Sequence, residues 1–427
     1  MKLLYLVLDG VADRPQDGPT SLELASTPAL DELARKAKGG MMYTIGRGIA
    51  PESDSAVLSI LGYDPEKYYT GRGPLEALGA GVRIKEGYEV AFRANFATVD
   101  SKTKKIIDRR CGRDLTSEEA RKLAESLNEM ELGVPEAYVR IIPTIGHRAV
   151  VIVGHRTQKL SGNVSNTDPA YVKKGRISIA VKEYSNIIAE CKPLDETPEA
   201  RRTAYIVNVF TKRAIEVLDG HPVNLERQRR GKLKANAILL RDAGDSLPKV
   251  RTLNDIYKLS FSAIVEMPVE KGIARLLGMS IAEVSPPTGN RRKDYTERME
   301  VTLDLLKRSD VVYVHLKGPD EPGHDGDRER KVRVIEDIDR YYVAPLLDNI
   351  DLSEVAILVT ADHATPYTVR AHTDDPVPVI LASERIEHDG LKAFNERECA
   401  KGSLGLIEHG WQLLPKVLKV LGLGVNA

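Results

Sequence analysis

The feature that most constrains the fold is the alternation of short apolar runs with helical segments after about residue 260. Short apolar runs bounded by turn residues are typical of strands buried inside a sheet. Strands that alternate with helices predict a layered α/β domain, in which helices cover the faces of the sheet. The predicted strands are 263–265, 311–316 and 355–360, and the predicted helices are 270–277, 295–307 and 329–342.

The beginning of the chain has the same pattern, whereas the middle does not. Residues 2–8 predict a buried strand, and 21–38 have helical spacing. The middle is richer in strand-like runs and basic clusters, and neither end makes a full sheet alone. The length of 427 residues fits two domains. We therefore predict one domain built from 1–88 and 260–427, interrupted by an inserted domain at 89–259.

Composition excludes several classes of protein. The 62 basic residues balance 62 acidic ones, so we expect no nucleic-acid and no membrane partner. The first apolar run meets Asp9 too early for a signal sequence or a membrane span. Cys111, Cys191 and Cys399 form no CxxC pair, which favours a reducing, cytoplasmic location. Scarce glutamine with plentiful Lys, Arg and Glu favours a thermophilic source.

Three predicted strands end in residues that suit divalent cations. Asp and His are unfavourable at the end of a buried central strand. The carboxyl edge of an open α/β sheet is where ligands bind. Asp320 and His324, for example, lie four apart in a Gly/Pro-rich turn after the run at 311–316. Carboxylates and imidazoles suit Mn²⁺, Zn²⁺ or Co²⁺, and this set suffices for two cations. The candidate ligands are Asp9, Asp320, His324, Asp362, His363 and His372.

The other histidines are not expected to bind metal. An isolated histidine is usually structural, and only the joint placement of several ligands at strand ends is hard to explain otherwise. His315 lies inside a predicted strand and is interpreted as a packed residue. The remaining ones have no ligand partner nearby in the sequence; they are His147, His155, His221, His388 and His409.

A serine nucleophile is predicted in the loop that opens the helix at 56–61. Ser53 and Ser55 both lie there, where backbone N–H groups and the helix dipole suit a phosphoryl group. Serine is also the commonest N-cap, so the position alone proves little. Cations nearby would lower the pKa of the hydroxyl and make it a nucleophile. The residues themselves do not decide between Ser53 and Ser55.

These motifs resemble the alkaline phosphatase superfamily and, within it, the cofactor-independent phosphoglycerate mutases of the archaeal type. The likeness covers nearly the whole chain and is loosest in the middle. It implies an alkaline-phosphatase-like three-layer α/β sandwich with an inserted α+β lid domain. The segments that carry it are PESD at 51–54, LSILGYDP at 58–65, GRGPLEA at 71–77, GIARLLGM at 272–279 and VHLKGPDE at 314–321.

The resemblance implies interconversion of 2-phosphoglycerate and 3-phosphoglycerate through a phosphoserine, without bisphosphoglycerate. It makes Ser53 the nucleophile, and Lys271 a catalytic residue that stabilises phosphoryl charge. Two divalent cations are implied, with Mn²⁺ expected and Co²⁺, Zn²⁺ or Mg²⁺ possible. One is expected on Asp320, His324 and His372, and the other on Asp9, Ser53, Asp362 and His363.

The resemblance further implies that arginines of the inserted domain hold the carboxylate and phosphate of the substrate, since the guanidinium fork suits both groups. A phosphomonoesterase or another phosphotransferase of the superfamily is the alternative, because it differs only in the acceptor. A non-catalytic metal-binding or phosphate-binding protein is disfavoured, because every expected ligand and the serine are present. The candidate arginines are Arg93, Arg110, Arg113, Arg148 and Arg241.

Overall fold

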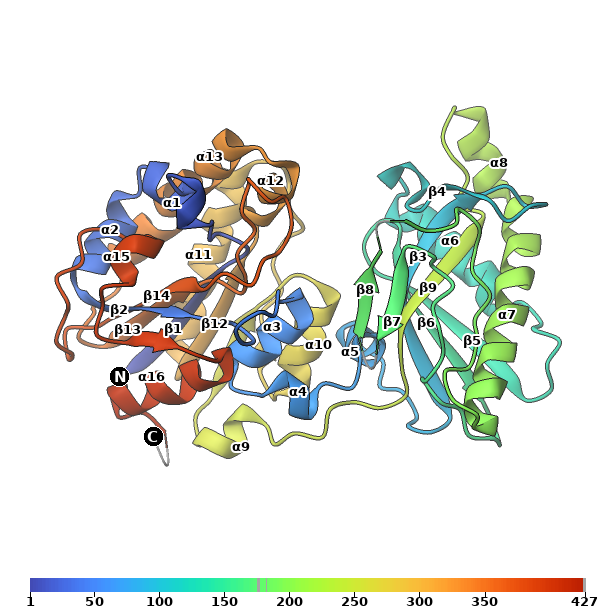
Figure 1. Ribbon diagram of the computed structural model, residues 1–427, viewed down its shortest axis with the longest axis horizontal. Helices are drawn as coiled ribbons and strands as arrows, with labels where there is room; N and C mark the ends of the chain where they lie inside the picture. Colours follow the sequence, from blue (N-terminus) through green and yellow to red (C-terminus); the bar gives the residue numbers. More distant parts are fainter. Residues whose placement is uncertain (175–176, 182, 425–427) are drawn as a thin grey trace. The chain divides into compact units, whose positions relative to one another are not determined.

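The computed structural model describes residues 1–174, 177–181 and 183–424, and the chain divides into two compact units (Figure 1). The first unit consists of Met1–Tyr68 and Val250–Ala427, and the second of Tyr69–Lys249. The second unit therefore begins and ends earlier in the chain than the inserted domain predicted from the sequence at 89–259. The reason at the first boundary is helix α5 (Arg72–Gly79), which packs against strands of the second unit.

The described part of the first unit is built on an eight-stranded sheet in the order β11-β10-β12-β1-β13-β14-β2-β15. The central strands β10, β12, β1 and β13 are parallel, whereas β14 runs antiparallel to both its neighbours. Every residue of β12 and β13 is buried, as expected for strands covered on both faces. The strands are β1 (Lys2–Leu8), β2 (Ala37–Met42), β10 (Phe261–Ile264), β11 (Ser280–Ile281), β12 (Val311–Leu316), β13 (Val355–Thr360), β14 (Val377–Ala382) and β15 (Gly405–Ile407).

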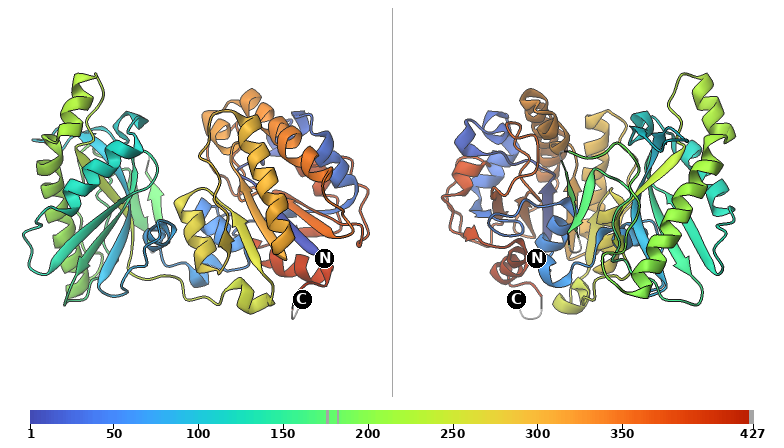
Figure 2. Two further views of the ribbon diagram at one scale, coloured as in Figure 1. Left: turned by 180° about the vertical axis from the view of Figure 1, so that it is seen from behind. Right: turned by 45° about the vertical axis from the view of Figure 1, so that its right-hand side comes forward.

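Helices cover both faces of this sheet (Figures 1 and 2). On one face lie α2 (Pro28–Arg35), α11 (Arg291–Arg308), α13 (Arg328–Ile338) and α14 (Ala344–Leu347), and on the other α3 (Ser53–Ile60), α10 (Pro268–Leu276) and α16 (Leu413–Leu421). The shorter elements are α1 (Ser21–Leu24), α4 (Pro65–Tyr68), α9 (Leu253–Tyr257), α12 (Asp320–Asp325), α15 (Glu396–Cys399), the 3-10 helices η1 (Pro15–Asp17) and η4 (Gly410–Gln412), and the π-helix η3 (Asp339–Val343).

The single helix predicted at 21–38 is wrong. The structure has two helices there, α1 and α2, followed by strand β2 from Ala37. Pro28 lacks an N–H group and has a fixed φ, so it begins a helix readily and cannot continue one. Residues 37–42 pair with β14, a long-range partner that the local spacing does not reveal.

The second unit contains an antiparallel sheet in the order β4-β3-β6-β5, and β9 also pairs with β3. Even-numbered residues of β3, such as Phe92 and Phe96, are buried in a core that includes Phe210 of α7. The described elements are β3 (Glu89–Val99), β4 (Ile106–Asp108), β5 (Ala137–Pro143), β6 (Arg148–His155), β9 (Ala237–Gly244), the hairpin β7 (Tyr171–Lys174) and β8 (Ile177–Ala180), α6 (Ser117–Asn128), α7 (Pro198–Asp219), α8 (Pro222–Arg229) and the 3-10 helix η2 (Cys111–Arg113).

The predicted class, an α/β sandwich with an inserted α+β unit, is confirmed.

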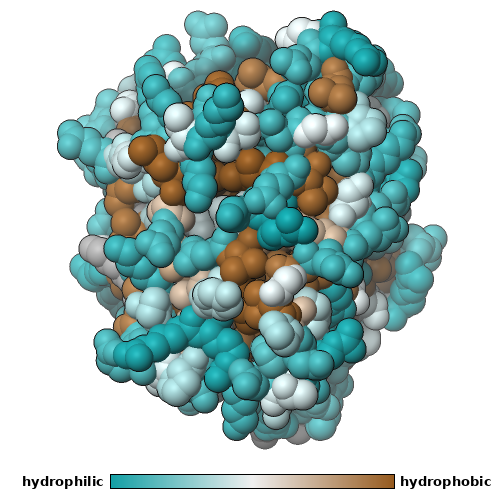
Figure 3. All heavy atoms as spheres, turned by 90° about the vertical axis from the view of Figure 1, so that its right-hand side faces the viewer, coloured by the Kyte–Doolittle hydropathy of each residue, from teal (hydrophilic) through white to brown (hydrophobic). Residues whose placement is uncertain are grey.

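The side of the second unit that carries α7 is mostly hydrophilic, with hydrophobic atoms showing between polar ones at its centre (Figure 3). Among the described residues, each helix is either too short or too polar to cross a bilayer.

Candidate metal centre and anion-binding face

The parallel strands of the first unit deliver the predicted ligands to one edge of the sheet. Strand β1 lies between β12 and β13, with Leu8 opposite Leu316 and Val7 opposite Thr360. The residues that follow these strands therefore emerge side by side. Gly10 allows the close approach, because it has a φ of 60° and a Cβ there would lie 2.8 Å from Asp320 Oδ1.

The first ligand cluster is centred on Asp320, at the start of α12. Its Oδ1 atom lies 3.3 Å from His324 Nε2 and 3.4 Å from His372 Nε2. Burial raises the pKa of Asp320, but the neighbouring imidazoles of His324, His372 and His363 outweigh this effect and hold that pKa far below the ordinary value. The structure thus brings together the three residues that the resemblance grouped on one cation.

The second cluster is more deeply buried. His363 Nε2 lies 3.5 Å from Asp9 Oδ1 and 3.2 Å from Asp362 Oδ2. Asp362 Oδ1 accepts the N–H groups of Gly10 (3.0 Å) and His363 (3.1 Å), which turns Oδ2 toward the cluster. Burial raises the pKa of Asp362, yet the neighbouring imidazoles of His363 and His315 lower it well below its ordinary value.

Thr365 joins the two clusters and fixes the state of His363. Its hydroxyl donates to Asp320 Oδ1 at 2.7 Å and lies 2.9 Å from His363 Nδ1. A hydroxyl has one proton to donate, so Thr365 must accept from the Nδ1–H group of His363. The neutral His363 ring then carries its lone pair on Nε2, the atom that faces Asp9 and Asp362.

His315 lies beside this cluster, although its place inside a strand predicted a packed residue. It is fully buried, and its Nε2 atom lies 3.3 Å from Asp362 Oδ2 and 3.8 Å from Asp9 Oδ1. One signal was present in the sequence. Three side chains with polar ends occupy alternate positions along and just beyond β12, and they are Tyr313, His315 and Lys317. Alternate residues of a strand point to the same face, so these three lie together at the C-terminal end of β12.

Lys317 and Glu270 complete the charged network. Lys317 Nζ lies 3.2 Å from Asp9 Oδ2 and also contacts the buried carboxylate of Glu270. Burial lowers the pKa of Lys317, but the carboxylates of Asp9 and Glu270 raise it above the ordinary value. Burial and Lys317 likewise lower the pKa of His315, whereas Glu270 and Asp362 raise it to about 10.

The residues present fit the divalent cations that the resemblance implies. Buried polar atoms are nearly always hydrogen-bonded in folded proteins. Here several have no hydrogen-bond partner among the described residues, and His315 Nε2 and His363 Nε2 both face Asp362 Oδ2. A set of carboxylate oxygens and imidazole nitrogens is typical of Mn²⁺ and Zn²⁺ sites. The unpartnered atoms are His315 Nε2, Asp362 Oδ2, His363 Nε2 and His372 Nε2.

The two predicted catalytic side chains lie on α3 and α10. Ser53 is the first residue of α3, and the carbonyl of Pro51 just before it lies 2.8 Å from His372 Nδ1. The Ser55 hydroxyl donates to the Glu52 carbonyl at 3.1 Å, within the first turn of the helix. Lys271 of α10 forms an ion pair with Glu283 at 2.9 Å.

In the second unit, three of the predicted arginines share one face of the sheet. Arg93 of β3 stands opposite Arg241 of β9, and Arg148 of β6 stands opposite Asn95, two residues further along β3. Side chains alternate along a strand, so Arg93 and Asn95 point away from the core that holds Phe92 and Phe96. Arg241 packs on Tyr171, with its guanidinium 3.8 Å from the ring centre.

These arginines are close enough to perturb one another. Burial lowers the pKa of Arg93 to about 9, with further lowering by Arg72 and Arg241. Burial also lowers the pKa of Arg148, reinforced by Arg72. The pKa of Arg110 is lowered by burial and then by Arg113, so the structure also brings these two predicted residues together.

A concentration of partly desolvated positive charge is favourable for an anion. Burial and the charges of Arg148, Arg110, Arg113 and Arg93 lower the pKa of His147 to about 4, which keeps that ring neutral at pH 7. Arg72 and Tyr171 belong to this face but were not predicted. Their sequence neighbours carry no ligand-like pattern, and only the packing of α5 and β7 places them here.

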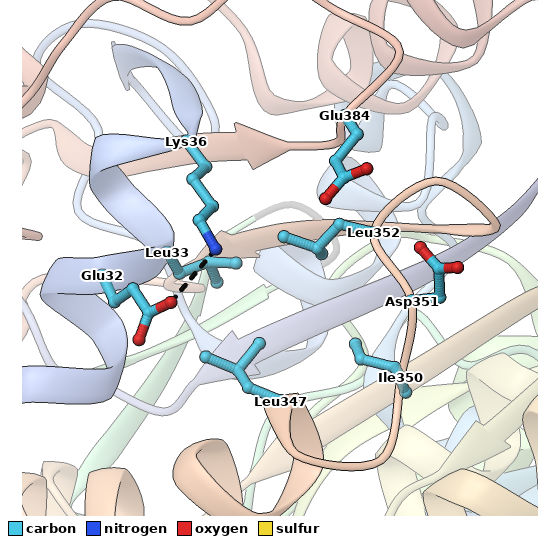
Figure 4. Close-up of a pocket in the computed structure, with 8 residues that line it drawn as sticks. All are labelled: Glu32, Leu33, Lys36, Leu347, Ile350, Asp351, Leu352 and Glu384. Carbon is cyan, nitrogen blue, oxygen red and sulfur yellow. Dashed lines mark hydrogen bonds and ion pairs between the residues drawn. The ribbon is translucent and has the colours of Figure 1, made fainter.

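A separate hollow of the first unit lies away from the ligand clusters (Figure 4). It is found where β13 begins, whereas Asp362 follows the end of that strand. Lys36 and Glu32 form an ion pair of 3.0 Å within it. The lining residues are Glu32, Leu33, Lys36, Leu347, Ile350, Asp351, Leu352 and Glu384.

Known proteins resemble this chain over its whole length. The family model described as 2,3-bisphosphoglycerate-independent phosphoglycerate mutase matches residues 34–224. A protein of that name from Aeropyrum pernix is 48% identical over 425 residues, which covers 99% of this chain and 100% of the relative. One from Archaeoglobus fulgidus, also so named, is 42% identical over 427 residues, with 99% and 98% covered.

Two solved structures are also similar. A protein from Pyrococcus horikoshii has a TM-score of 0.78 and 31% identity, with 99% of this chain and 97% of that chain covered. The cofactor-independent phosphoglycerate mutase from Thermoplasma acidophilum has a TM-score of 0.65 and 32% identity, with 98% and 99% covered.

Proposed function

This chain belongs to the 2,3-bisphosphoglycerate-independent phosphoglycerate mutases, and on that premise we propose that it interconverts 2-phosphoglycerate and 3-phosphoglycerate. The observation that carries the proposal is the convergence of six predicted ligands at one sheet edge, with buried polar atoms that lack hydrogen-bond partners among the described residues. An arrangement of this kind is what metal-assisted phosphoryl transfer requires.

We assign two divalent cations to the two clusters. Asp320, His324 and His372 would hold one, and Asp9, Asp362 and His363 the other, with Ser53 as a further ligand. The donor set of carboxylates and imidazoles supports Mn²⁺, and also allows Co²⁺ or Zn²⁺, with Mg²⁺ less suited to imidazole. When bound, such cations would neutralise phosphoryl charge and lower the pKa of a nearby hydroxyl.

Ser53 is the proposed nucleophile. Its hydroxyl oxygen forms a bond to phosphorus, the bond between phosphorus and the glycerate oxygen breaks, and that oxygen takes up the proton that the Ser53 hydroxyl gives up. The products of this half-reaction are phosphoserine and glycerate. Glycerate then presents its other hydroxyl, which accepts the phosphoryl group from Ser53. The position of Ser53 at the start of α3, two residues after Pro51, supports this role, because helix N-termini stabilise phosphoryl groups. Lys271 is the proposed cationic partner of the phosphoryl oxygens.

The arginines of the second unit are the proposed binding groups for substrate. Arg93, Arg148 and Arg241 present guanidinium groups on one sheet face, and Arg110 and Arg113 add charge nearby. Such groups bind carboxylates and phosphates bidentately. We propose that the second unit acts as a lid that retains glycerate while the phosphoryl group is on Ser53, which protects the intermediate from water.

We also place the protein in the cytoplasm of a heat-adapted organism. Cys111, Cys191 and Cys399 are buried free thiols in the structure, which is compatible with a reducing compartment. The many charged residues and scarce glutamine support adaptation to heat.

Matched serine variants test the proposal. Ser53→Ala should abolish isomerisation in an assay that couples 2-phosphoglycerate formation to its consumption, because no other group receives the phosphoryl. Ser55→Ala should keep substantial activity, since the Ser55 hydroxyl already donates to Glu52. Trapped phosphoenzyme should carry its phosphate on Ser53. Net release of phosphate without isomerisation would instead identify a phosphomonoesterase.

A further inference from the structure

The buried cluster contains four candidate ligand atoms rather than three. His315 Nε2 and His363 Nε2 each lie beside the same two carboxylate oxygens, Asp9 Oδ1 and Asp362 Oδ2. The four distances are 3.8 and 3.3 Å from His315, and 3.5 and 3.2 Å from His363. Adjacent ligands at about 2.1 Å from a five-coordinate cation lie about 3.0–3.6 Å apart, so these spacings are close to those of a site that also takes Ser53.

The orientation of His315 supports the same reading. Its Nδ1 atom faces away from the cluster, 3.3 Å from the Tyr313 hydroxyl and 3.7 Å from Glu270 Oε1. In the neutral ring, which is the form that binds a cation, a carboxylate beside Nδ1 favours the proton on that nitrogen and leaves the lone pair on Nε2. This arrangement, in which a second residue orients the ring of a metal-binding histidine, is the usual support for such ligands.

Lys317 keeps the network charge-balanced without blocking the ligand atoms. It contacts Glu270 and lies 3.2 Å from Asp9 Oδ2, the oxygen that is not shared with the histidines. Asp9 Oδ1 therefore stays directed at His315 and His363. Among the described residues His315 Nε2 makes no hydrogen bond, and it faces the same two carboxylate oxygens that His363 Nε2 faces.

We propose that His315 is a protein ligand of the cation held by Asp9, Asp362 and His363. This inference rests on the proposed function, since it requires that a cation binds there. It makes the site richer in nitrogen than the resemblance implies, and a second imidazole favours Mn²⁺, Co²⁺ or Zn²⁺ over Mg²⁺.

Metal binding to the stripped full-length protein tests this proposal without an activity readout. Zn²⁺ and Mn²⁺ stoichiometry and affinity would be measured by equilibrium dialysis for the parent, His315→Ala and His315→Gln. The control is His155→Gln, which alters another buried histidine, on β6 of the second unit. We expect two cations per chain in the parent and the control. Both His315 variants should bind the second cation at least about 100-fold more weakly, above the range for losing a supporting residue alone.

A structure of the Zn²⁺-loaded parent covers the case in which the variants do not fold. Its anomalous density should place His315 Nε2 at about 2.0–2.1 Å from one cation. A separation beyond about 3 Å, or unchanged affinity in folded His315 variants, overturns the assignment. A parent that binds no cation at Asp9 and Asp362 contradicts the proposed function itself, so the two failures are distinguishable.

Discussion

Glu396 makes the stability of the first unit depend on pH in a direction that can be measured. This residue begins α15 and is 1% exposed. Its carboxylate accepts the Asp13 N–H at 2.9 Å and the Thr20 hydroxyl at 2.7 Å. Burial raises the pKa of Glu396 from 4.5 to about 7, because those two hydrogen bonds compensate only part of the lost hydration.

The direction of the pH dependence follows from whether the folded or the unfolded protein holds the proton of Glu396 more tightly. A raised pKa in the folded protein means that the protonated carboxyl stabilises the fold. This contribution is complete below the unfolded value of 4.5 and is lost as the pH rises through about 7. At about 1.36 kcal/mol for each pH unit between the two values, the loss is about 3 kcal/mol.

Glu396→Gln removes this titration. The amide oxygen can still accept the Asp13 N–H, and the Thr20 hydroxyl can rotate to accept from the amide group. We therefore expect the free energy of unfolding of the variant, relative to the parent, to increase by about 3 kcal/mol between about pH 4.5 and pH 8. At low pH the two proteins should differ little.

Urea unfolding of metal-free protein at several pH values provides the measurement. Trp411 is the single tryptophan of the chain and lies in the first unit, so its fluorescence reports on the unit that contains Glu396. Glu398→Gln is the matched control, because that side chain is on the same helix and its pKa is lowered by a hydrogen bond with Lys401. A stability difference for Glu396→Gln that stays constant with pH would refute the reasoning.

Three further predictions follow from the described contacts. Asp320→Asn should lose one of the two bound cations and keep the other, because the second cluster uses separate ligands. Elemental analysis measures the cations per chain, and full metal content in this variant would contradict the grouping. Arg227→Met should destabilise the second unit by about 3 kcal/mol in calorimetry, because the fully buried Arg227 pairs with Asp114 (2.5 Å) and Glu119 (2.8 Å) and also donates to the carbonyl of Leu233. Arg241→Leu should lower kcat/KM at least about tenfold with unchanged metal content, as expected for one lost charge-assisted bond; normal kinetics would make Arg241 a structural charge.

Much of the first unit could be predicted because its strands are local, continuous apolar runs. Residues 2–8, 311–316 and 355–360 form strands with the predicted bounds. Each is followed by polar residues that a buried strand cannot accommodate, so the sequence also indicated which side chains would lie at the sheet edge. Once β1 pairs in parallel with β12 and β13, Asp9, Asp320 and Asp362 lie at the same edge of the sheet.

The rest depended on contacts between residues far apart in the chain. His315 looks like a core residue until β1 pairs with β12 on one side and with β13 on the other, which places Asp9 and Asp362 near its Nε2 atom. Arg72 joins the arginine face only because α5 packs on β3 and β9. The spacing of apolar residues indicates which face of its own helix or strand a side chain occupies. The residue that it contacts on that face is determined by strand register and helix packing. The sequence by itself therefore determined the strands and their ligand-bearing ends, and the tertiary structure decided which ligands share a site.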